Sequence, residues 1–287
     1  MSRNSRRTKV RQVNKPAPQP TPPSHLNDKS NPFGISFVVP THTVELPSRG
    51  NYYPQESTMA GREKVEIKQM TAKQEEILSN ADYLLDGTML DRLVASILTD
   101  KTINVEEMLS GDKNAIIVEA RRTSYGSEYG VTQACEKCKN NEVFMFDLSK
   151  VSIEDREVEG VTYSEQTNLF HFKLPSTGLE ASIKMLSSAD ERFLNEQNNK
   201  AKKLNIENSE TLNFLRRCVV SVNNIEDKQL LNNLFSVLPV LDIRKIKKVS
   251  NSIVPTLNTK QEVTCGGCGH VTESEVPFSL GFFWPDI

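Results

Sequence analysis

The chain has 287 residues, a formal net charge of −2 and a hydrophobic fraction of 37%, which is typical of a globular protein of one large or two ordinary domains. No run approaches the roughly 20 apolar residues that a membrane span needs, and the N-terminus lacks the apolar core of a secretory signal. The five cysteines, an odd number, argue against a secreted disulfide framework. We therefore expect a protein of a reducing cytoplasm with no membrane partner.

The first 31 residues form a basic arm, with seven Lys and Arg against Asp28 alone (+7 − 1 = +6), so the remainder carries −2 − 6 = −8. Its five prolines and few large apolar side chains predict disorder over 1–31. Such an arm is either a contact for nucleic acid or an anionic surface, or a solubilising tail. It contains no aromatic residue, so base stacking is not available to it.

An N-terminal α+β region is expected over 32–150. An apolar strand near 32–39 precedes an extended segment over 44–54, in which Gly50 is free to take a positive φ. The alternation in 64–68 predicts a strand with one buried face, and Thr71 with Gln74 forms a capping box. Apolar spacing then predicts helices over 90–98, 105–109 and 113–123, with Gly111 ending the second of them.

A strand-then-helix insertion is expected over 151–260. Apolar and alternating runs predict a strand over 142–148, before the insertion, and within it strands over 157–163, 169–174 and 180–185 and helices over 187–204, 211–222, 228–234 and 240–249. The helix over 187–204 has few apolar residues, so we interpret it as a solvated helix or a partner-facing arm. The predicted fold is α+β, with a mixed strand-helix body, a helix-rich insertion and a last segment over 261–287.

Two C-x-x-C pairs, Cys135/Cys138 and Cys265/Cys268, are the strongest motif of the chain. Four thiolates in two such knuckles bind one tetrahedral Zn²⁺, and a site with four protein ligands leaves no open position for catalysis. Both pairs are preceded by β-formers and followed by candidate strands, which is typical of the hairpins of a zinc ribbon. We therefore predict a split zinc ribbon in which all four cysteines hold a structural zinc, and in which three glycines around Cys268 relieve the second turn.

Two rival interpretations of the cysteines remain open. His270 lies two residues after Cys268 and could replace a cysteine as ligand. A C-x-x-C pair is also the motif of thiol oxidoreductases, but those motifs precede a helix that lowers the thiolate pKa, and no convincing helix follows either pair here. Cys218, within an apolar stripe, is interpreted as a core residue.

No other catalytic arrangement is visible. None of the four histidines lies in an H-E-x-x-H motif, and the chain has no phosphate-binding loop and no G-x-S-x-G. We therefore expect a protein that is not an enzyme.

Several segments, in this order, resemble the baseplate hub assembly proteins of T-even-type tailed bacteriophages. These are the run LPSRGNYYP over 46–54, the run VEIKQMTA over 65–72, the run SYG over 124–126 before the first cysteine pair, and the ending with Cys265 to His270, Pro277-Phe278 and Phe282-Phe283. The resemblance implies a viral protein that acts in building the hub of a contractile tail, with other hub proteins as partners, in the host cytoplasm or in the virion. It transfers no catalytic residue, and it does not cover the basic arm or about 150–260.

Two segments are candidates for partner contacts. The run over 46–54 contains Arg49, Tyr52 and Tyr53, and Arg and Tyr are common interface anchors. The C-terminal aromatics Phe282, Phe283 and Trp284 either cover the ribbon or form a docking peptide. The leading interpretation is a component or assembly factor of the baseplate hub that acts by protein–protein contact. The alternative is a zinc-ribbon protein that binds nucleic acid, or is associated with transcription, through residues 1–31.

Overall fold

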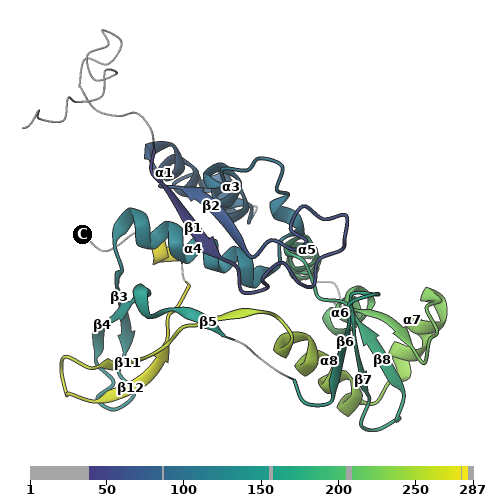
Figure 1. The fold of residues 1–287 in the computed structure, drawn as a ribbon. Helices are drawn as coiled ribbons and strands as arrows, with labels where there is room; N and C mark the ends of the chain where they lie inside the picture. Colours follow the sequence, from purple (N-terminus) through teal and green to yellow (C-terminus); the bar gives the residue numbers. More distant parts are fainter. Residues whose placement is uncertain (1–38, 86, 155–157, 205–208, 279, 284–287) are drawn as a thin grey trace, which may run out of the picture. The chain divides into compact units, whose positions relative to one another are not determined.

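The computed structural model describes residues 39–85, 87–154, 158–204, 209–278 and 280–283 (Figure 1). The predicted arm over 1–31, most of the strand expected over 32–39, and Trp284 lie outside these residues. Runs of helices and runs of antiparallel strands follow one another through the described part, which confirms the α+β class.

The first strands form a two-stranded sheet. Strand β1 (Thr41–Glu45) pairs antiparallel with β2 (Lys64–Lys68), with Val44 opposite Val65. The predicted alternation of β2 is confirmed, because Val65 and Ile67 are buried while the lysines at its ends are exposed. Strand β1 begins earlier than the predicted extended segment, because its polar residues Thr41 and Thr43 give little apolar signal.

A helical block follows this sheet. It consists of α1 (Ala72–Leu78), α2 (Ala81–Leu85), α3 (Met89–Ile97), the short 3-10 helix η2 (Val105–Glu107) and α4 (Ser110–Tyr125). The capping box at the start of α1 is confirmed, since the Gln74 side chain accepts a hydrogen bond of 3.0 Å from the backbone N–H of Thr71. The leucines and valines of α3 that face the core are buried, as their spacing predicts.

The prediction for Gly111 is wrong. This residue lies in the first turn of α4 and does not end the preceding helix. A Cβ at this position would lie 1.7 Å from the carbonyl oxygen of Pro255, so the glycine lets two segments far apart in sequence touch. Pro255 immediately precedes β10 (Thr256–Asn258), which pairs with β5 (Ser152–Glu154). The role of this glycine therefore depends on a tertiary contact, which no local sequence pattern predicts.

The middle of the chain forms a four-stranded antiparallel sheet. Its strands are β6 (Val161–Ser164), β7 (Leu169–Lys173), β8 (Glu180–Ile183) and β9 (Val219–Val222), in the order β6-β7-β8-β9. Before it come β3 (Glu128–Ala134), β4 (Asn141–Asp147) and the 3-10 helix η3 (Leu148–Lys150). The strand predicted over 157–163 begins only at Val161, and Glu157 lies outside the described residues.

The later helices are α5 (Ser188–Leu204), α6 (Glu210–Cys218), α7 (Lys228–Val237) and α8 (Val240–Ser252), and the chain ends in β11 (Lys260–Thr264), β12 (Val271–Glu275) and the 3-10 helix η4 (Leu280–Phe283). The helix predicted over 211–222 is wrong in its second half. It ends at Cys218, and the next four residues form β9. β-Branched Val219, Val220 and Val222 favour a strand, and the free edge of β8 supplies the pairing partner.

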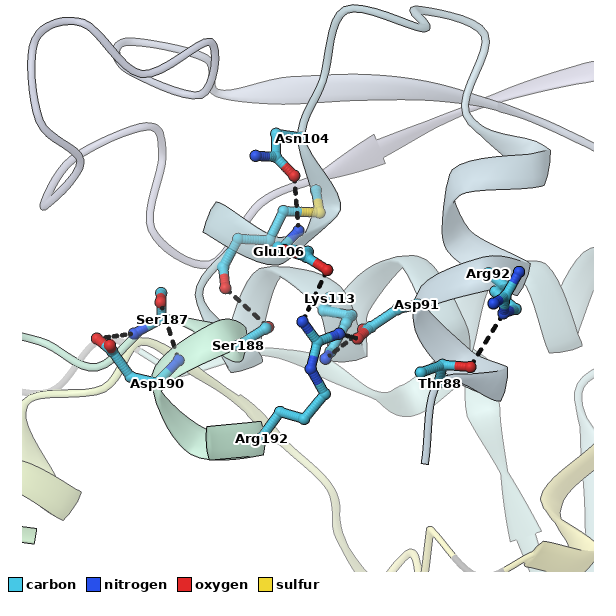
Figure 2. Close-up of polar contacts among 11 residues, drawn as sticks. Thr88, Asp91, Arg92, Asn104, Glu106, Lys113, Ser187, Ser188, Asp190 and Arg192 are labelled. Carbon is cyan, nitrogen blue, oxygen red and sulfur yellow. Dashed lines mark hydrogen bonds and ion pairs between the residues drawn. The ribbon is translucent and has the colours of Figure 1, made fainter. Parts of the chain in front are cut away.

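Helix α5 is tied to the N-terminal helical block by charge (Figure 2). Arg192 donates to Asp91 of α3 at 3.1 Å and to Glu106 of η2 at 2.7 Å. Lys113 of α4 contacts the same Asp91 at 2.8 Å, and the Ser188 hydroxyl donates to the Met108 carbonyl at 2.8 Å. The first turns of α5 are therefore a structural joint, whereas Asn195, Glu196, Asn199 and Lys200 further along are exposed, as expected for a solvated helix. These contacts join residues on either side of the boundary predicted between 32–150 and 151–260. The predicted domain boundaries stay predictions.

Asp190, in the first turn of α5, also holds the start of this helix in place. Its Oδ2 accepts from Lys184 at 2.7 Å and from the backbone N–H of Ser187 at 3.2 Å, and its Oδ1 accepts from Arg217 at 2.5 Å. Burial opposes ionisation of this carboxyl, but the two cations and the backbone donor prevail and hold its pKa below the usual value. The ionised Asp190 therefore connects α5 with α6 and with the segment that follows β8.

Candidate metal centre

Two β-hairpins carry the four cysteines of the C-x-x-C pairs. Strands β3 and β4 pair from Glu128↔Asp147 to Ala134↔Asn141, and β11 and β12 pair from Lys260↔Glu275 to Thr264↔Val271 (Figure 1). Each hairpin ends in a turn that begins with the first cysteine of its pair. This arrangement confirms the strands predicted on either side of both knuckles.

The two turns have the same backbone hydrogen bonds. In the first, the N–H of Cys135 donates to the carbonyl of Asn140 and the N–H of Lys139 donates to the carbonyl of Cys135, both at 2.9 Å. In the second, the N–H of Cys265 donates to the carbonyl of His270 at 2.8 Å and the N–H of Gly269 donates to that of Cys265 at 2.9 Å. The knuckles are thus two copies of one local structure.

The residue after the second cysteine of each pair lies in the left-handed region. Lys139 has φ 64° and Gly269 has φ 66°. Glycine takes this conformation without steric cost, whereas a lysine is disfavoured by roughly 1 kcal/mol. The prediction that all three glycines of the second knuckle serve its backbone is wrong. Only Gly269 among them has a positive φ, and a Cβ on Gly267 would lie 2.6 Å from a carboxylate oxygen of Glu142.

The four sulfurs converge from the two hairpins. The Sγ of Cys135 lies 3.8 Å from that of Cys268, and the Sγ of Cys138 lies 3.9 Å from that of Cys265. All four lie within 4.8 Å of one another. Four sulfurs at about 2.3 Å from a central Zn²⁺ in a tetrahedron are about 3.8 Å apart, whereas a disulfide is about 2.05 Å long. The described cysteines are free, and their spacing fits a metal ion between them.

The electrostatics of this group favour a cation. Backbone N–H donors of Cys138 and Lys137 lower the pKa of Cys135 to about 7. The N–H of His270 acts in the same direction on Cys268, but burial and the other three thiols raise the pKa of Cys268 to about 11. A first thiolate therefore forms readily and opposes the ionisation of its neighbours. A divalent cation would remove that repulsion, and these residues could hold one.

A shared interior joins the hairpins away from the sulfurs. Phe144, Phe146 and Val263 are buried. The Gln261 side chain accepts from the backbone N–H of Asp147 at 2.9 Å and donates to its carbonyl at 2.8 Å. Glutamine thus pairs with the edge of β4 as another strand would. We call the two hairpins with their cysteines the ribbon.

The rival interpretations of the cysteines receive no support. His270 does not belong to the group of potential ligands found within the described residues. Each C-x-x-C turn leads into a β-strand, not into a helix that would activate a thiolate for redox chemistry. Cys218 is fully buried, and burial raises the pKa of its thiol to about 11, which confirms its place in the core.

Arg121 of α4 fixes the C-terminal segment beside the ribbon. The side chain is fully buried, and its guanidinium donates to the carbonyls of Phe282 and Gly126 at 2.9 Å and of Glu128 at 3.2 Å. The ring of Phe282 contacts Tyr129 of β3 with the centroids 5.1 Å apart. No sequence pattern indicates this role, because an arginine within a helix usually faces solvent.

The predicted partner-binding residues lie in different environments. Phe282 and Phe283 are 2% exposed and Tyr53 is 7% exposed, so this chain itself covers their rings. Partner binding through them stays a prediction that would require the segments to leave these positions. Arg49 is exposed, and Tyr52 is half-buried with its ring 4.8 Å from that of Tyr163. Trp284 is not among the described residues.

Asp112, which the sequence analysis did not single out, holds the segment over 46–54 in place. Its carboxylate accepts from the backbone N–H of Ser48 at 2.8 Å, from the Ser48 hydroxyl at 2.5 Å and from the Tyr53 hydroxyl at 2.8 Å. The positive φ expected at Gly50 is confirmed at 75°, and Arg49 and Tyr52 also have positive φ, at 52° and 67°. A fully buried carboxylate thus stabilises a loop whose backbone is strained at two residues.

Comparison with known families gives a match to almost the whole described chain. A family model described as T4 bacteriophage base plate protein matches residues 39–284. The chain belongs to this family. Comparison with curated proteins and with solved structures gave no match. The baseplate protein has no described helix that is both long and apolar enough to cross a bilayer.

Proposed function

We propose that this baseplate protein is a component or assembly factor of the hub of a contractile tail, and that it acts by protein–protein contact and not by catalysis. The observation that supports this most is the family match over residues 39–284. Its expected partners are other baseplate proteins, and its expected locations are the host cytoplasm during assembly and the tail of the virion.

We further propose that the four cysteines hold a structural Zn²⁺. The ion would join two segments far apart in the chain, since Cys138 and Cys265 are separated by 127 positions. Four protein ligands would fill its coordination sphere and leave no position for substrate or water. The ribbon would then be a rigid element that holds the C-terminal strands against β3 and β4.

The nucleic-acid alternative has less support. Surfaces that bind phosphate are basic, whereas the exposed charges of β11 and β12 include Glu262, Glu273 and Glu275 against Lys260. Contact through residues 1–31 stays a prediction. Salt-dependent DNA binding that is lost when residues 1–31 are removed would favour it.

The proposal is tested by mass spectrometry of purified virions beside infected-cell lysate. Stoichiometric peptides from both samples would support a structural component of the baseplate. Peptides from the lysate alone, together with virions that lack a hub when the gene is disrupted, would support an assembly factor. Intact, infectious virions after disruption would contradict both forms of the proposal.

A further inference from the structure

Strand β1 is hydrogen-bonded along one edge only. It pairs with β2, and no other strand of the described part pairs with it. Two bonds that flank the strands fix the phase of this pair. The N–H of Gln69 donates to the carbonyl of Pro40, and the N–H of Leu46 donates to the carbonyl of Glu63, both at 2.9 Å. Because bonded and non-bonded residues alternate in an antiparallel pair, the even-numbered residues of β1 direct their backbone N–H and C=O groups towards β2.

The odd-numbered residues of β1 direct the same groups away from β2. These residues are Thr41, Thr43 and Glu45, and the edge towards which they point carries no described strand. A row of backbone donors and acceptors of this kind is a template for a further strand. The free edge of β1 can therefore accept an extended segment, which would be held by main-chain hydrogen bonds.

A groove of about 560 Å³ borders this free edge. Residues 43–45 of β1 line it, and successive side chains of a strand point to opposite faces of its sheet. Three consecutive lining residues therefore place the groove at the edge of β1 and not over one face. Its other wall is apolar, with half-buried Val151, Ile153 of β5 and Leu257 of β10. We call this space the β1 groove.

The charges of the β1 groove cancel. Its lining residues include Glu45 and Glu119 against Arg49 and Arg122. Both carboxylates already have ion-pair partners, since Glu45 contacts Lys64 at 2.8 Å and Glu119 contacts Arg122 at 2.7 Å. A charged segment would gain little from such a lining. An occupant of the β1 groove should therefore be extended, uncharged and apolar on one side.

The longest part of the chain outside the described residues contains a segment of that kind. Residues 32–38 have the sequence Pro-Phe-Gly-Ile-Ser-Phe-Val and carry no charge. Their large apolar side chains, Phe33, Ile35 and Phe37, stand at alternate positions. A period of two is typical of a strand with one apolar side. The segment therefore has the length, the period and the neutrality that the free edge and the β1 groove require.

The same copy of the chain is poorly placed to supply this segment. Only Val39 and Pro40 separate it from the start of β1. A two-residue hairpin that folded the segment back beside β1 would need positive φ at its turn, which Val39 does not have and proline cannot take. A second copy has no such constraint.

We propose that residues 32–38 of one copy of this chain add as a strand to the free edge of β1 in a second copy. The backbone of the segment bonds to Thr43 and Glu45, and its apolar side chains enter the β1 groove. Because each copy has one segment and one free edge, reciprocal exchange closes a two-fold dimer. This inference concerns the purified chain and does not depend on the proposed role in the hub.

The test combines sedimentation velocity with amide hydrogen exchange of the full-length protein at about 200 μM. The parent should sediment as a dimer, and the N–H groups of Thr43 and Glu45 should be protected from exchange. Phe33→Asp with Phe37→Asp changes the segment and should give a monomer in which both N–H groups exchange fast. Leu85→Asp is the matched control, since Leu85 is 86% exposed on α2, and it should form dimers as the parent does.

A variant in β1 removes the other half of the contact. Thr43→Pro deletes an N–H that points to the free edge and leaves the hydrogen bonds to β2 in place, so it should also be a monomer. Its dissociation constant should rise about tenfold or more. Unchanged thermal melting shows that each variant folds. If Thr43→Pro melts early, the exchange of Thr43 and Glu45 in the Phe33/Phe37 variant still reports on the edge.

Mixing the two monomeric variants decides whether the segment and the edge belong to one contact. The Phe33/Phe37 variant retains its edge and Thr43→Pro retains its segment, so the mixture should form 1:1 dimers joined by one segment. A parent that is monomeric at about 200 μM overturns the proposal, and protection of Thr43 in that monomer would assign the edge to the same copy. Dimers that both variants leave intact, or a mixture that stays monomeric, also overturn it. Binding of a different baseplate protein that is lost in Thr43→Pro, with a monomeric parent, would assign the β1 groove to that protein and overturn the proposal as well.

Discussion

The ribbon and the helical block, to which α5 is tied, are held together in different ways. The ribbon has a small interior, with Phe144, Phe146 and Val263 buried and four sulfurs at its end. The helical block buries α3 and α4 against the first sheet and adds ion pairs such as Arg192 with Asp91. Loss of the metal should therefore destabilise the ribbon alone, while loss of a buried polar contact should destabilise the helical block. Variants in each region separate the two effects.

The largest loss of stability is expected when one thiolate is removed. Cys265→Ser should abolish the proposed metal site, because three remaining ligands bind zinc far more weakly, and a structural zinc contributes about 10–16 kcal/mol in peptide systems. Amide hydrogen exchange should show β3, β4, β11 and β12 exposed, while α3 and α4 stay protected. Cys218→Ser is the matched control for loss of a thiol, and it should leave the exchange of the ribbon unchanged. Equal exposure of both regions would contradict the separation.

Removal of a buried carboxylate should destabilise the helical block and not the ribbon. Asp112→Asn replaces an acceptor of three hydrogen bonds with a group that has one oxygen and two donors, so we expect unfolding to become easier by about 2–4 kcal/mol. Denaturant unfolding measures this change. Asp82→Asn is the matched control, since Asp82 is exposed in the first turn of α2 and its charge should contribute less than about 1 kcal/mol. An unchanged midpoint for Asp112→Asn would show that the loop over 46–54 does not need this anchor.

Removal of the Asp190 charge should destabilise the protein less, and by an amount that depends on pH. Its pKa is lowered in the folded protein, so its contribution is present above the unfolded pKa of about 3.9 and is lost as the pH falls through the lower folded value. At pH 7, Asp190→Asn should therefore destabilise the protein by about 1–3 kcal/mol. The difference in melting temperature between parent and variant should shrink between about pH 5 and pH 3. A constant difference over that range would mean that the charge of Asp190 is not what stabilises the joint.

The mildest change is a gain of stability within the ribbon. Lys139→Gly makes the first knuckle match the second and removes the cost of a left-handed lysine, so we expect stabilisation by about 0.5–1 kcal/mol. Thermal melting of the zinc-loaded protein measures it. Lys137→Gly, one residue before Cys138, is the control, because Lys137 has no positive φ and gains nothing from glycine. A loss of stability in Lys139→Gly would indicate that the lysine side chain makes a contact of its own.

The ribbon is easier to predict from sequence than the rest of the molecule. The paired C-x-x-C motifs encode their own turns, so Cys135 and Cys265 and their flanking strands are found from local pattern. The strand over 219–222 is missed because its valines continue the apolar stripe of α6 and only the edge of β8 selects the strand. Gly111 and Asp112 are missed because their roles depend on Pro255 and Ser48, which are distant in sequence. Motifs that determine their own local structure can be predicted from one sequence, whereas contacts between residues that are distant in sequence cannot.

Native mass spectrometry of the full-length protein, combined with alkylation of its thiols, decides whether the ribbon holds a metal. We predict one zinc ion per chain, with Cys135, Cys138, Cys265 and Cys268 protected until a chelator is added. A mass without zinc, and four thiols that react without a chelator, would contradict the ribbon as the metal-held clasp of this baseplate protein.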